Sequence, residues 1–216
     1  KLDKLDLKAK ARYNQNSKDS TFVQVDNFYV KTGRSYLKLQ ANANYKKGKE
    51  YIKADIKGNV DLYAMNQLYP FLENGKVRGS MSADLNTYFF LEDVTNMNVS
   101  QIHTNGTVTG DDVRVSIPSE KLSLYVDSLR LKVNTNTGVQ SRRTGTLDTA
   151  LVNSHLAFSN LTLRYKRSVK ADVDRLSMMF YADDLSGNKA PKLRTMLSLR
   201  GIDAQTKDSV KFKAKR

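Results

Sequence analysis

The 216-residue sequence has no cysteine, no tryptophan, three prolines and only two histidines. Without cysteine there is no disulfide framework, no cysteine-ligated zinc or iron–sulfur site and no thiol nucleophile. His103 and His155 lie about fifty residues apart, which argues against a histidine-based metal site or a Ser-His-Asp triad. We therefore predict no catalytic residue, no metal ligand and no cofactor.

Apolar residues are also scarce. They make up 39% of the chain, against roughly 45–50% in ordinary soluble domains. No apolar run approaches the roughly 18 residues that a membrane-spanning helix needs. The deficit favours elements that each bury one face only.

The dominant pattern is alternation of apolar and polar residues. In 52–62, for example, Ile52, Ala54, Ile56 and Val60 are separated by charged or polar residues. Successive side chains of a strand point to opposite faces, so each such segment has one apolar and one polar face. We predict about a dozen one-sided strands, antiparallel to one another. The alternating segments are 5–11, 37–45, 52–62, 81–85, 113–117, 122–126, 129–133, 161–165, 169–173, 176–180, 197–199 and 210–214.

Other segments interrupt the alternation. In 64–72, Met65, Leu68 and Leu72 have helical spacing, so we predict a short helix there that Pro70 limits in length. Asn105-Gly106 and Gly110-Asp111-Asp112 are typical of turns. The polar stretch 134–146 is expected to be a long loop and a sub-boundary within a single domain, 1–216. Because alternation continues through Val210, Phe212 and Ala214 to the last residues, we interpret the chain as a segment of a longer polypeptide.

Three motifs follow one another between Ile52 and Val115. The first is Gly58-Asn59-Val60-Asp61-Leu62, with Leu68, Pro70 and Leu72 after it. The second is Gly75-Lys76-Val77-Arg78-Gly79, which runs into Ala83-Asp84-Leu85. The third is Gly106-Thr107-Val108-Thr109-Gly110-Asp111-Asp112. This succession resembles the AsmA-like proteins, including their TamB-type relatives, over residues 22–133.

The resemblance implies a bacterial envelope protein that is anchored in the inner membrane by an N-terminal helix and extends through the periplasm. It implies a β-sheet curled into an open, taco-like groove with an apolar lining. It also implies a non-enzymatic role in moving phospholipid towards the outer membrane and in assembling that membrane. The expected ligand is a phospholipid or another acyl-chain molecule, with unidentified envelope proteins as further partners.

The predicted groove lining consists of the apolar sets in the best-matched region. A trough for acyl chains needs a continuous apolar strip, since each buried methylene contributes about 0.8 kcal/mol. A closed β-sandwich that serves as an adhesion or scaffold module has the same alternation and remains the alternative. The predicted lining residues are Leu37, Leu39, Ile52, Ile56, Val60, Met81, Leu85, Val113, Val115, Leu122, Leu124 and Val126.

The net charge of +14 has three interpretations. Basic β-proteins bind nucleic acid when aromatic side chains interleave with the basic ones, and Arg164-Tyr165-Lys166-Arg167 is the densest such cluster. The sequence has no RNP-like or OB-fold signature, so nucleic acid is not predicted as a partner. Attraction to an anionic membrane surface is the more natural use of the charge. Solvated strand faces rich in lysine explain it equally well.

Paired carboxylates are the remaining chemical signal. Asp172 and Asp174 lie two residues apart, which is a spacing that could serve glycoside hydrolysis or a hard cation. However, aspartates are spread through polar positions and turns along the whole chain. Solvated faces and turn chemistry explain that distribution, and we predict that the protein is not an enzyme.

Overall fold

The computed structural model describes residues 2–13, 21–45, 50–68, 70–72, 74–96, 102–140, 147–166, 168–183, 192–206 and 211–214. Within these ranges, 136–140, 147–151, 183 and 211 are described by their backbone only.

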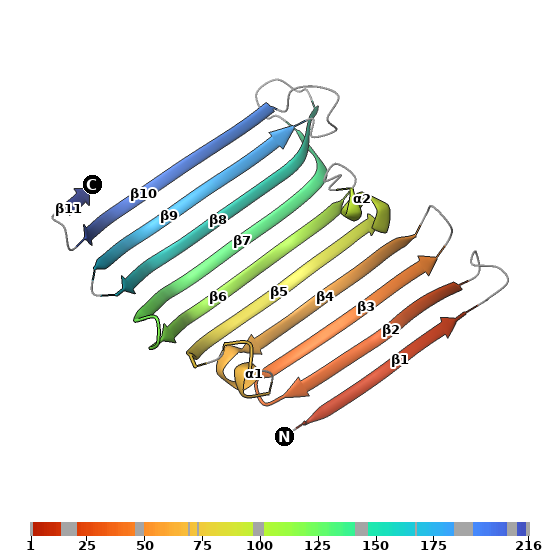
Figure 1. Ribbon diagram of the computed structural model, residues 1–216. Helices are drawn as coiled ribbons and strands as arrows, with labels where there is room; N and C mark the ends of the chain where they lie inside the picture. The colour runs from red at the N-terminus through yellow and green to blue at the C-terminus, as the bar shows by residue number, and fades with distance from the viewer. Residues whose placement is uncertain are drawn as a thin grey trace.

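The strands form one antiparallel sheet in which each strand pairs with the next in sequence (Figure 1). The sheet is open and does not close on itself, because β1 and β11 lie at opposite edges. The predicted all-β, antiparallel fold class is thereby confirmed, with eleven strands in the described part of the chain. The strands are β1 (Lys4–Arg12), β2 (Thr21–Thr32), β3 (Ser35–Tyr45), β4 (Tyr51–Asp61), β5 (Lys76–Phe90), β6 (His103–Ile117), β7 (Leu122–Gln140), β8 (Leu147–Tyr165), β9 (Val169–Asp183), β10 (Lys192–Thr206) and β11 (Lys211–Ala214).

The register places the alternating apolar residues on one side of the sheet, which we call the apolar face. Directly paired residues of an antiparallel sheet share a face. One row of pairs runs through Leu7, Phe28, Leu39, Ile56 and Leu85, from β1 to β5. A second row on the same face links Leu131, Leu156, Met178 and Leu197, from β7 to β10. The apolar face therefore extends across the whole sheet.

In several long strands, the alternation between apolar-face and polar-face residues shifts by one residue partway along the strand. In β6 the apolar face holds Gly110 and then Val113, so two residues lie between consecutive apolar-face positions instead of one. The same shift recurs in β7 to β10, and the register on either side of it is unchanged. The shifts therefore form one transverse row, which we call the crease. Its residues are Asp112, Asp127, Asn160, Asp174 and Gly201.

The backbone explains how the crease is made. Asp112, Asn160 and Gly201 have positive φ angles of 49°, 49° and 58°, a conformation that Asn, Asp and Gly tolerate best. Asn160 Nδ2 donates to Asp127 Oδ2 at 3.2 Å, which links two neighbouring crease residues. Two sequence predictions fail here, because Gly110-Asp111-Asp112 is a bend inside β6 and Asn105-Gly106 lies within the same strand. Segments 122–126 and 129–133 are likewise two halves of β7.

The expected loop at 134–146 is also largely wrong. Strand β7 continues to Gln140 and β8 begins at Leu147, with pairs such as Thr137 with Ala150 between them. The polar side chains did not prevent strand formation, because backbone hydrogen bonding to a neighbour does not depend on side-chain polarity. Residues 141–146 of the expected loop lie outside the described ones.

Two short helices stand at the ends of strands. Helix α1 (Leu62–Leu68) begins two residues before the predicted segment 64–72, because Asp61 Oδ1 accepts the backbone N–H of Ala64 at 2.9 Å and caps the helix. The Asp61 N–H in turn donates to the buried Ser35 Oγ at 2.8 Å. Helix α2 (Leu91–Thr95) follows β5 and was not predicted, because five residues are too few for a helical period.

Candidate functional site

All twelve predicted lining residues lie on the apolar face. They come from β3 to β7, and several pair directly: Leu39 with Ile56, Val60 with Met81, and Val115 with Leu124. The two sides of the crease stay on one face, since a Cβ built on Gly110 would lie 3.0 Å from Val113 Cγ2 and 3.4 Å from Leu129 Cβ. The sheet thus brings together residues that are up to ninety positions apart in the sequence.

The apolar face is wider than the predicted lining. Strands β8 to β10 add residues such as Phe158, Leu176 and Leu199, which pair with one another in one row. Strand β1 adds Leu5 and Leu7 at the other side. These residues alternate in the sequence in the same manner, but the motif resemblance covers residues 22–133 only and did not select them.

Much of this face is open to solvent. Among the described residues, no large side chain is fully buried, and the buried hydrophobic residues are Ala54, Leu62, Val77, Val126 and Ala182. Leu7 is 61% exposed and Leu197 58% exposed. The side chains of this face therefore contact their neighbours sideways, but no second layer of described residues lies over the whole face.

The two ends of the apolar face differ from its middle. Helix α1 lies against β5 and β4 at one end, where Leu62 and Val77 are buried. At the other end Thr87 and Thr104, paired across β5 and β6, share a hydrogen bond of 2.9 Å between their hydroxyls. The buried hydroxyl of Thr135 accepts a hydrogen bond from the backbone N–H of Thr104 and donates one to the carbonyl oxygen of Ile102. Mutual hydrogen bonding satisfies these polar groups without interrupting the sheet.

The opposite side of the sheet, which we call the polar face, carries the charges. Lys57 Nζ lies 2.9 Å from Asp84 Oδ2 on the neighbouring strand, and this hydrogen bond and charge raise the pKa of the lysine. Tyr29 and Tyr36 stack on this face with ring centroids 6.4 Å apart. As the alternation predicts, Tyr36 belongs to the polar face and Tyr45 to the apolar face.

The paired carboxylates do not form one site. Asp172 accepts hydrogen bonds from Arg164 at 3.0 Å and Thr162 at 2.9 Å, whereas Asp174 lies in the crease beside Gly201. Partial burial acts to raise the pKa of Asp172, but the hydrogen bonds from Arg164, Thr162 and Lys170 outweigh it, so that the pKa lies below its ordinary value. Within the described residues, no group of three or more His, Asp or Glu side chains could hold a metal ion.

The histidines lie on the polar face. His155 Nε2 is 2.8 Å from Ser177 Oγ, and the His103 ring lies 5.9 Å from that of Tyr88. Neither has a nucleophile and a carboxylate at hydrogen-bonding distance in the part of the chain that the structure describes. Among the described helices, none is long and apolar enough to cross a membrane.

Comparison with known proteins adds no relative. No family model, no curated protein and no solved structure matches the chain.

Proposed function

We propose that this chain is a non-enzymatic, periplasmic segment of an AsmA-like envelope protein whose apolar face shields phospholipid acyl chains during lipid transport to, or assembly of, the outer membrane. The observation that carries the proposal is the continuous apolar face, which crosses β1 to β10 with much of its surface uncovered. The resemblance of the motifs between Ile52 and Val115 supports the proposed family and location.

Physical chemistry favours an amphiphile on such a face. An acyl chain that buries about ten methylenes against apolar side chains gains roughly 8 kcal/mol relative to water. Exposed apolar patches larger than a few hundred Å² are uncommon on soluble monomers and mark interaction surfaces. Side chains on this face are mostly aliphatic, with few groups that would demand a polar partner.

The alternative, a closed β-sandwich module for adhesion or scaffolding, needs a second apolar layer. The described strands form one sheet, so that layer would have to come from a second copy or from another protein. Light scattering on the purified chain distinguishes these cases, because a lipid-shielding sheet is expected as a lipid-loaded monomer and a sandwich as a lipid-free dimer.

Lipid extraction and native mass spectrometry of the purified protein test the proposal directly. The informative variants are Leu7→Gln and Leu197→Gln, since both side chains are on the apolar face and more than half exposed. Met196→Gln is the matched control, because Met196 is adjacent to Leu197, points to the polar face and is 69% exposed. We expect bound phospholipid to fall at least threefold in the double Leu variant and to stay unchanged in the control.

A photo-crosslinking residue refines the test within the sheet. Placed at Leu39 it should form phospholipid adducts, and placed at the neighbouring Lys38 on the polar face it should not. A folded protein that copurifies with no phospholipid, or equal adducts at both positions, would contradict the proposal.

A further inference from the structure

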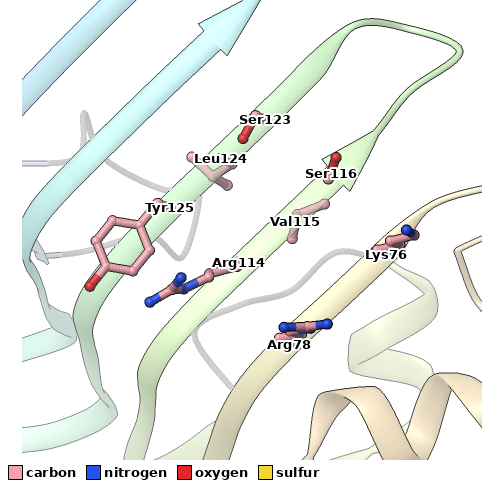
Figure 2. A pocket seen from close by; sticks show the side chains of 8 residues that line it. All are labelled: Lys76, Arg78, Arg114, Val115, Ser116, Ser123, Leu124 and Tyr125. Atoms are coloured by element: carbon pink, nitrogen blue, oxygen red, sulfur yellow. The ribbon is translucent and has the colours of Figure 1, made fainter.

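A second surface lies on the polar face, at the end of β5, β6 and β7 where α1 also stands. It is a pocket of about 530 Å³. Figure 2 shows its side chains on three adjacent strands, with β6 and β7 curving just beyond Arg114 and Tyr125. The polar residues that line it are Lys76, Arg78, Arg114, Ser116, Ser123 and Tyr125.

Register puts like charges side by side in this pocket. Arg78 pairs directly with Arg114 across β5 and β6, and Lys76 pairs with Ser116 one step along the same face. Like charges directly opposite each other destabilise a sheet. The arrangement therefore favours an anion that lies between the two guanidinium groups.

Only part of this positive charge is neutralised within the protein. Arg114 Nη2 lies 2.8 Å from Asp112 Oδ1, and its guanidinium lies 4.9 Å from the centre of the Tyr125 ring. These contacts hold Arg114 in place over β7. Within the described residues, Lys76 and Arg78 have no carboxylate partner, so their donors remain available.

Two serines among the lining residues supply neutral donors. Ser116 and Ser123 are directly paired across β6 and β7, in the same row as Lys76. Proteins bind phosphate with arginine guanidinium groups, lysine ammonium groups and hydroxyls. A phosphate has several strong acceptor oxygens, and one guanidinium group can donate to two of them at once.

We propose that this pocket binds a phosphate group, carried either by a soluble phosphate ester or by an anionic lipid headgroup. Arg78 and Lys76 provide the uncommitted charge, Arg114 provides a preoriented guanidinium, and Ser116 and Ser123 complete the oxygen contacts. The site draws every group that would contact the phosphate from the polar face, opposite the acyl-chain surface, although Val115 and Leu124 of the apolar face also line the pocket. It therefore stands or falls independently of the proposed function.

The test compares two double variants of equal charge. The site variant is Lys76→Gln with Arg78→Gln, which removes exposed side chains that have no partner in the described structure. The matched control is Lys38→Gln with Lys132→Gln, which removes two exposed lysines of the same face outside the pocket. Circular dichroism melting confirms that both variants remain folded.

Binding is measured with glycerol 3-phosphate by calorimetry, and by flotation with phosphatidylcholine vesicles that contain or lack phosphatidylglycerol, all at one ionic strength. We expect saturable binding that weakens at least tenfold in the site variant and less than twofold in the control. Binding of glycerol 3-phosphate identifies a soluble ester as a sufficient ligand, whereas binding of the phosphatidylglycerol vesicles alone identifies the lipid headgroup. Equal losses in both variants, or no saturable binding of any probe, would overturn the proposal.

Discussion

At the residue scale, Asp172 shows how the polar face is held in register. Its carboxylate contacts Arg164 and Thr162 on β8 and Lys170 on its own strand, at 3.0, 2.9 and 3.3 Å. These donors favour the ionised form more than partial burial opposes it, and the pKa of Asp172 is lowered as a result.

Because the folded-state pKa is lowered, the stabilisation from this carboxylate is complete above the ordinary value of 3.8 and is lost as the pH falls through the folded-state value. Asp172→Asn should therefore reduce the free energy of unfolding by about 1 kcal/mol at pH 7. The difference from the original protein should shrink below pH 3.8. Urea unfolding at pH 7, 4 and 3 measures it, and a difference that is constant with pH would contradict the prediction.

Glycines at positive φ allow a second test at the same scale. A Cβ on Gly79, where φ is 103°, would lie 2.4 Å from the carbonyl oxygen of Asp112, whereas a Cβ on Gly33, where φ is 57°, would have nothing within 4 Å. Gly33→Ala should cost about 1 kcal/mol for its backbone conformation alone. Gly79→Ala should cost roughly 2 kcal/mol more, since backbone must move. Equal losses in denaturant unfolding would show that the close approach at Gly79 is not real.

At the element scale, the crease determines how long strands keep one apolar face. At the crease, each of the strands β6 to β10 has two residues between consecutive apolar-face positions. Neighbouring strands therefore remain paired in one register on both sides of the crease. A shift in one strand alone would turn the apolar residues of half of that strand to the polar face.

The helix cap is the element whose stability can be tested most simply. Asp61 ends β4 and caps α1 through Ala64. Asp61→Ala should cost about 1 kcal/mol and Asp61→Asn less than half of that, because an asparagine oxygen can accept the same hydrogen bond. Chemical denaturation compares the two variants, and an equal cost for both would assign the effect to charge and not to capping.

At the scale of the whole molecule, stability should decrease from the centre of the sheet to its edges. All described residues of β1 and residues 192–200 of β10 are exposed, whereas β6, β7 and β8 are flanked by long strands on both sides. Amide hydrogen exchange should therefore be slowest in β6 to β8 and fastest in β1 and β11. Uniform protection from β1 to β11 would contradict a single open layer and indicate that a second layer covers the sheet.

The same decrease in stability from centre to edge should appear in the cost of shortening apolar side chains. Val77 is 4% exposed and Leu7 is 61% exposed. Val77→Ala should cost about 1–2 kcal/mol and Leu7→Ala less than about 1 kcal/mol, although leucine is the larger residue, because only the buried side chain leaves a cavity. Thermal unfolding of the two variants measures the order, and the reverse order would contradict it.

Sequence reasoning was most accurate where a pattern depends only on local geometry. Alternation around Leu39, Ile56 and Leu124 predicts both a strand and the face on which each residue lies, because the side-chain period of a strand is two. It failed where the period changed: Gly110-Asp111-Asp112 has turn chemistry, yet a neighbouring strand with the same two-residue shift keeps it inside a longer strand. It also failed at Asn134–Gln140, where pairing with β8 outweighs polar composition.

Part of the apolar face was predictable from the sequence, but its extent was not. Its twelve lining residues were chosen from a motif resemblance, and the register places them on one face. The phosphate pocket could not be found from sequence, because Arg78 lies 36 residues before Arg114 and the two meet only through strand pairing.

The amino-acid sequence by itself determined that the strands are one-sided and that one face is apolar, because that information is carried by the spacing of adjacent residues. Only the tertiary structure decided that these faces join into one open sheet and that the crease keeps them aligned. It also decided that three basic side chains converge on the opposite side. Those outcomes depend on which strands pair and in what register, and pairing is a relation between separate strands that the alternation within one strand does not record.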